Sequence, residues 1–69
     1  MNRSDTFDRA RHRCQGLLAE GRLGEAVAQF VDDVRGVDPP IHHAEINRAV
    51  MLAAADDPKA VREWIGQWR

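Results

Sequence analysis

Residues 17–30 read LLAEGRLGEAVAQF, and this stretch decides how the chain folds. An apolar pair, Leu17 and Leu18, stands before Gly21, and a second apolar series begins after Gly24. Glycine often closes a helix because it adopts the left-handed backbone conformation without steric cost. Gly21 therefore predicts the end of one helix and a short turn into the next, which is the pattern of a helical hairpin.

On either side of this turn, apolar residues recur at three- and four-residue steps, as they do on one face of a helix. Asp5 is expected to cap a first helix that ends at Gly21. A second helix is expected from Glu25 to Arg35, with Gly36 closing it. These two segments form the first hairpin.

Two proline motifs divide the rest of the chain. Pro39-Pro40 marks a boundary, because proline is tolerated only in the first turn of a helix. A third helix is expected from about Ile41 to Ala55, and Asp57-Pro58 has the residue types of an N-cap and first position that open a fourth. The expected apolar positions are Phe7, Ala10, Cys14, Leu17 and Leu18, then Ala26, Val27, Phe30, Val31 and Val34, then Ala44, Ile46, Ala49, Val50, Met51 and Ala53, and last Val61, Trp64, Ile65 and Trp68.

No window alternates with a period of two, so the predicted fold class is all-α, with four short helices in two antiparallel hairpins. We expect a single domain over residues 1–69, with one hairpin at about 5–36 and the other at about 39–69. The net charge is −1 and Cys14 is the only cysteine, which excludes an intrachain disulfide. No apolar run is long enough to span a membrane or to form a signal peptide, so a cytoplasmic protein is expected.

The two hairpins repeat. Sliding the chain over itself by 34 residues aligns identical residues without a gap, and most of them are core positions. Apolar pairs such as Phe30 with Trp64 extend the match. The identical pairs are Ala10 with Ala44, Leu18 with Leu52, Ala19 with Ala53, Ala26 with Ala60, Val27 with Val61 and Arg35 with Arg69.

In this period and in residues 17–30 the sequence resembles the tetratricopeptide repeat family, whose unit is a helix–turn–helix of about 34 residues. Gly21 stands at the turn, Glu25 precedes the small residue Ala26, and Phe30 follows that alanine by four residues. The resemblance covers nearly the whole chain. It implies two stacked helical hairpins that serve as a binding scaffold.

The second unit matches less closely. It keeps Ala60 and Trp64, but Ala55 takes the place of the turn glycine and Lys59 takes the place of the acid. A small four-helix bundle whose spacing coincides with this period is therefore the alternative architecture.

Proteins of this family bind peptides in a groove lined by the first helix of each hairpin. By correspondence, the resemblance places Asp8, Arg11, Gln15 and Leu18 of the first unit and His42, Glu45, Ala49 and Leu52 of the second on that face. Arg11 with Gln15 is expected to hold a carboxylate, since an arginine can donate two parallel hydrogen bonds to one.

The C-terminal end carries Trp64 and Trp68, which are four residues apart and so share a helix face. One interpretation is that both tryptophans fold back onto the first hairpin. The other is that Trp68 at least contacts another chain, with a homodimer as the simplest case.

Enzymatic and metal-dependent chemistry is not expected. Zinc sites need three or four protein ligands, and His42 with Glu45 offers two on one helix face, so no metal and no cofactor are predicted. Ser4 is the only serine and Thr6 the only threonine, and both lie beside the terminus, so a hydroxyl nucleophile on rigid structure is absent. Cys14 lies on an apolar stripe, where a thiol is buried and inert.

The sequence therefore predicts a non-enzymatic protein–protein interaction module, such as a small adaptor, a chaperone-like subunit or an inhibitor, that binds a partner protein or peptide. The alternative is a small transcription-associated regulator that contacts nucleic acid through Arg9, Arg11 and Arg13. The acidic outer residues of the second helix, Glu25 and Asp32, would repel phosphate, which disfavours this alternative.

Overall fold

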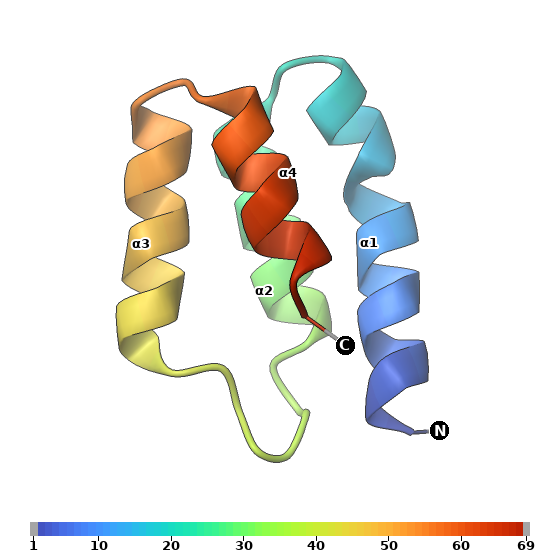
Figure 1. The fold of residues 1–69 in the computed structure, drawn as a ribbon. Helices are drawn as coiled ribbons and strands as arrows, with labels where there is room; N and C mark the ends of the chain where they lie inside the picture. The colour runs from blue at the N-terminus through green and yellow to red at the C-terminus, as the bar shows by residue number, and fades with distance from the viewer. Residues whose placement is uncertain (1, 69) are drawn as a thin grey trace.

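The computed structural model describes residues 2–68. Four helices span this part of the chain: α1 (Arg3–Ala19), α2 (Leu23–Asp33), α3 (His43–Ala54) and α4 (Pro58–Gly66). The helices run alternately up and down, with α4 in front of α2 and with α1 and α3 on opposite sides (Figure 1). Each helix contacts its neighbours in sequence, and α4 also contacts α1 and α2. The prediction of a small all-α fold of four helices is confirmed, and their arrangement is that of a helical bundle.

The first helix begins earlier than the sequence suggested. Asn2 is its N-cap, and the Asn2 side-chain oxygen accepts a hydrogen bond of 2.8 Å from the backbone N–H of Asp5. The prediction that Asp5 caps the helix was therefore wrong, and Asp5 instead lies in the first turn. An acid is favourable there because the helix dipole is positive at that end.

The turn at Gly21 closes α1 as predicted. Gly21 has a φ of 75°, and the N–H groups of Gly21 and Arg22 donate to the carbonyls of Leu18 and Leu17. This pair of bonds is a Schellman motif. Because the turn is so short, α2 begins at Leu23 rather than Glu25, and it ends at Asp33 rather than Arg35.

The second hairpin makes the same turn with a different residue. Asp56, with a φ of 55°, takes the left-handed position, and the N–H groups of Asp56 and Asp57 donate to Ala53 and Leu52. The turn glycine is thus replaced by Asp56 and not by Ala55 as expected. The ends of α1 and α3, at Ala19 and Ala54, are therefore 35 residues apart (54 − 19) rather than 34.

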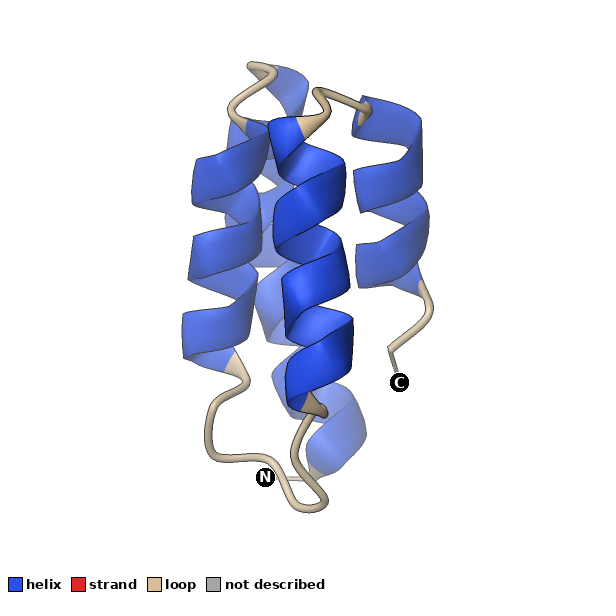
Figure 2. Cartoon of the chain, turned by 90° about the vertical axis from the view of Figure 1, so that its left-hand side faces the viewer, coloured by secondary structure: helices blue, strands red, loops and turns tan. Residues whose placement is uncertain are grey.

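The long connection between α2 and α3 lies at the same end of the bundle as the N-terminus (Figures 1 and 2). Arg3 donates a hydrogen bond to the Pro39 carbonyl of this connection. Ile41 packs against the core from the connection and is not yet helical, because His42 is the N-cap of α3. The predicted start of the third helix at Ile41 is corrected to His43. The predicted cap and first residue of α4, Asp57 and Pro58, are confirmed.

A row of aromatic rings runs through the centre of the bundle. Phe7 and Phe30 stack with ring centroids 6.1 Å apart, and Trp64 meets Phe30 edge-on at 5.8 Å. Trp68 lies 6.3 Å from Phe7. Trp64 is 3% exposed and Trp68 is half-buried, so the interpretation in which both tryptophans fold back onto the first hairpin is confirmed.

The apolar residues of α3 do not all face the core. Ala49 is the one residue of this helix that is fully buried, whereas Val50 is 54% exposed and Met51 is 71% exposed. Two of the apolar positions expected in the third helix, Val50 and Met51, therefore lie outside the core. Because apolar residues occur on every side of α3, its pattern does not identify the buried face. Within residues 2–68, no helix combines the length and apolar character required to cross a membrane.

Candidate partner-binding site

An apolar groove runs between α2 and α3, on the side of α3 that bears Val50. Its volume is about 480 Å³. Small residues on both helices, among them Gly24 and Ala54, allow the groove to form because they leave space between the two backbones. The groove is lined by Gly24, Val27, Ala28, Val31, Asp32, Arg35, Ile46, Val50, Ala53 and Ala54.

The groove continues toward the α2–α3 connection. A second hollow of about 340 Å³ shares Val31, Arg35 and Ile46 with the first and extends to Ile41 and His43. From Gly24 to Asp32, the helical part of the α2 wall is about 12 Å long at a rise of 1.5 Å per residue. This length is slightly more than two helical turns, and Arg35 extends the wall beyond the end of α2.

Charge lies on only one wall of the groove. Arg35 and Asp32 of the α2 side form an exposed ion pair of 3.4 Å. Exposed pairs of this kind contribute little to stability, so both side chains are available to other partners. The α3 wall carries only uncharged residues along the groove. The groove is thus an apolar trough with a polar edge at one end.

A separate, smaller hollow lies between α1 and α4. It has a volume of about 290 Å³ and is lined by Arg11, Gln15, Leu18, Ala19, Arg62 and Ile65. The structure therefore brings together three residues that the sequence assigned to partner binding, Arg11, Gln15 and Leu18. It adds Arg62 and Ile65 from α4, which sequence reasoning missed.

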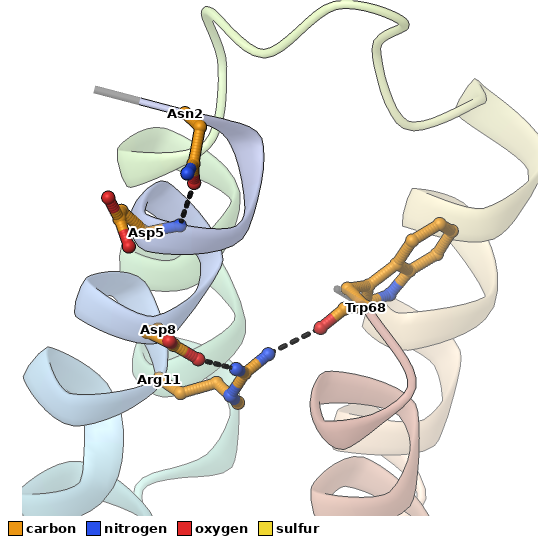
Figure 3. Close-up of polar contacts among 5 residues, drawn as sticks. All are labelled: Asn2, Asp5, Asp8, Arg11 and Trp68. Atoms are coloured by element: carbon orange, nitrogen blue, oxygen red, sulfur yellow. Dashed lines mark hydrogen bonds and ion pairs between the residues drawn. The ribbon is translucent and has the colours of Figure 1, made fainter.

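Arg11 is held between two acceptors (Figure 3). Its guanidinium pairs with the carboxylate of Asp8 and donates a hydrogen bond to the backbone carbonyl of Trp68. The Arg11 side chain is only 23% exposed, whereas that of Asp8 is 56% exposed. These contacts link α1 to the end of α4 and fix the position of the arginine.

The residues predicted in the second unit have structural contacts instead. His42 Nδ1 accepts a hydrogen bond of 3.1 Å from the Ala44 N–H and so caps α3. Glu45 Oε2 accepts one of 3.2 Å from the Trp64 indole. Ala49 is fully buried. Of these contacts, the hydrogen bond between Glu45 and Trp64 links α3 to α4.

The structure does not unite the two halves of the groove that the resemblance implied. α2 and α4 separate α1, with Asp8 and Arg11, from α3, with Glu45 (Figure 1).

Comparisons with protein-family models, curated proteins and solved structures find no match to the chain. The likeness to tetratricopeptide repeats therefore stays a prediction based on the sequence pattern.

The three arginines expected to contact nucleic acid in the alternative function, Arg9, Arg11 and Arg13, differ in their surroundings. Arg11 faces the α1/α4 hollow, and Arg13 forms an ion pair of 3.3 Å with Asp33 of α2. Of the three arginines, Arg9 alone has no ion pair within the described part of the chain. The three side chains do not form one continuous basic surface.

Groups that could carry chemistry are few in the described structure. Cys14 is fully buried, its thiol contacts the Arg11 carbonyl at 3.4 Å, and burial raises the pKa of the thiol. A raised pKa keeps the sulfur in its unreactive, protonated form. Among residues 2–68, no three histidine, cysteine or acidic side chains gather in a way that could hold a metal ion.

Proposed function

We propose that this chain is a non-enzymatic protein–protein interaction module that receives an amphipathic helix of a partner protein in the groove between α2 and α3. A small adaptor, a chaperone-like subunit or an inhibitor would work in this way. The observation that carries the proposal is the groove itself, together with the large exposed fraction of Val50, which lines its α3 wall and precedes the exposed Met51.

The groove suits a helix in shape and chemistry. Two antiparallel helices form a trough into which apolar side chains at three- and four-residue steps can insert, which is a recurring mode of peptide recognition. A partner helix of two to three turns would match the length of the α2 wall. Large apolar side chains of a small protein are exposed together mainly where another molecule covers them.

The residues that line the two walls of the groove indicate which side chains the partner helix carries. Val27, Val31 and Ile46 favour aliphatic side chains along the centre of the partner helix, because burying them removes apolar surface from water. Asp32 and Arg35 add a polar edge that can fix the helix in one direction.

Site-specific photo-crosslinking in cells that express the chain natively tests this proposal. A photoreactive amino acid at Val50, which lines the groove, should form an adduct with a partner, whereas the same group at the exposed His12 of α1 should not. The substitution Val50→Lys should abolish binding of the partner so identified while leaving the helical circular-dichroism spectrum unchanged.

Two results would contradict the proposal. If the Val50→Lys variant binds the partner as the original chain does, the groove is not the binding site. If the adduct at Val50 is a dimer of the chain, the occupant is a second copy and not a partner protein.

A further inference from the structure

The hollow between α1 and α4 has a composition unlike that of the α2/α3 groove. Two cations, Arg11 and Arg62, line it, and no carboxylate does. Its remaining lining is Gln15 and an apolar floor in which Leu18 and Ile65 are 8% and 3% exposed. Cationic and apolar groups therefore meet in one small cavity.

Arg11 is positioned before any ligand arrives. Its contacts with Asp8 and with the Trp68 carbonyl use two of its five N–H donors, which leaves the others for a ligand. A guanidinium that is already held in place loses less side-chain freedom when it binds. The pairing with Asp8 is partly exposed to water and so competes weakly with an incoming anion.

Arg62 supplies the second cation from the opposite helix. It is exposed, and none of the ion pairs formed within residues 2–68 includes it. Arginine recognises planar carboxylates with two parallel hydrogen bonds. Gln15 adds a side-chain amide that can donate a further hydrogen bond.

We propose that this hollow binds a carboxylate attached to an aliphatic group, with Arg11, Gln15 and Arg62 holding the carboxylate and Leu18 and Ile65 receiving the aliphatic part. A peptide that ends in leucine carries both groups on one residue, and a glutamate side chain beside an apolar residue carries the same chemistry. A phosphate fits less well because the floor of the hollow is apolar. This site is separate from the α2/α3 groove.

The test uses acetyl-Ala-Ala-Leu as the free acid and as its C-terminal amide, acetyl-Ala-Glu-Ala-amide, and inorganic phosphate. Each is titrated at low ionic strength into the chain labelled with ¹⁵N. Binding is followed through the side-chain signals of Gln15 and Arg62. The first acid or the glutamate peptide should shift these signals, and comparison of the two shows whether the carboxylate comes from a chain end or a side chain.

Two variants make the test specific. Arg62→Gln should lower the affinity for the carboxylate probe about tenfold or more, since hydrogen bonds between charged groups are strong. Arg9→Gln removes another exposed arginine, one of α1 that does not line the hollow, and it should leave the affinity within about twofold.

Several outcomes would overturn the proposal. The first is that the leucine acid and its amide bind equally well while the glutamate peptide does not bind. The second is that phosphate binds as tightly as either carboxylate probe, and the third is that no probe binds. The fourth is that Arg62→Gln and Arg9→Gln lower the affinity for the carboxylate probe equally. None of these outcomes bears on the α2/α3 groove, because the groove and the hollow share no lining residue.

Discussion

Replacing Trp64 by phenylalanine removes one hydrogen-bond donor from the interior and keeps an aromatic ring against Phe30. In the structure, the Trp64 indole N–H donates to Glu45 Oε2 at 3.2 Å, and this bond links α4 to α3. Hydrogen bonds to charged groups contribute about 1.5–3 kcal/mol. Because Glu45 is half-buried and keeps some contact with water, we expect a loss of about 1–2 kcal/mol in the free energy of unfolding.

A loss of this size is large for so small a protein. A chain of this length has a total stability of about 3–10 kcal/mol. The melting temperature should fall by about 5–15 °C, since 1 kcal/mol corresponds to roughly 4–8 °C in a domain of this size. Thermal and urea unfolding followed by far-ultraviolet circular dichroism measure both quantities.

Two controls separate the hydrogen bond from the smaller ring. Trp68→Phe makes the same change at a position where the indole N–H is buried with no acceptor in the described structure, so it should cost less than Trp64→Phe. A double-mutant cycle with Glu45→Ala should give a coupling of about 0.5–1.5 kcal/mol between Glu45 and Trp64. A coupling within about 0.3 kcal/mol of zero would refute the role assigned to this bond.

Three further predictions concern the turns and the buried thiol. Gly21→Ala should lower the free energy of chemical unfolding by about 1–2 kcal/mol, because a side chain is disfavoured at positive φ. For the same reason Asp56→Gly should raise it by about 0.5–1 kcal/mol. If both substitutions changed the free energy of unfolding in the same direction, this account would be contradicted. Asp57→Ala should cost about 1 kcal/mol by the same assay, because the Ala60 N–H loses its acceptor, and no change would show that the cap is dispensable. The buried Cys14 thiol should react with a thiol reagent only as fast as the protein unfolds. Because folding raises the pKa of the Cys14 thiol, the contribution of this thiol to stability should be complete at pH values below the pKa of the unfolded chain. It should decline as the pH rises toward the pKa of the folded protein. Cys14→Ala should remove this decline.

The fold class could be predicted because the helix ends carry residues with unambiguous conformational preferences. Gly21 adopts the positive φ that its place after an apolar pair suggested, and Asp57-Pro58 opens α4 as expected. Boundaries were less predictable where two residues competed for one role. Asn2 and Asp5 are both good caps, and the sequence alone did not show that the helix continues back to Asn2.

The candidate sites were predictable only in part, because each depends on which helices become neighbours. Arg11, Gln15 and Leu18 share one face of α1 by their spacing, and the structure confirms that they meet at one hollow. Arg62 could not be found from the sequence. It comes from α4, 51 residues after Arg11 (62 − 11), and periodicity within one helix carries no information about such a distant neighbour.

The aromatic row explains where the unburied apolar surface of this chain lies. Trp64 and Trp68 turn inward onto Phe30 and Phe7, so α4 covers α1 and α2 and closes that side of the bundle. The apolar face expected at the C-terminal helix is thereby buried. α3 then has one helix side left without a neighbour, and Val50 and Met51 occupy it, which is why the partner surface is proposed beside α3 and not at the tryptophans.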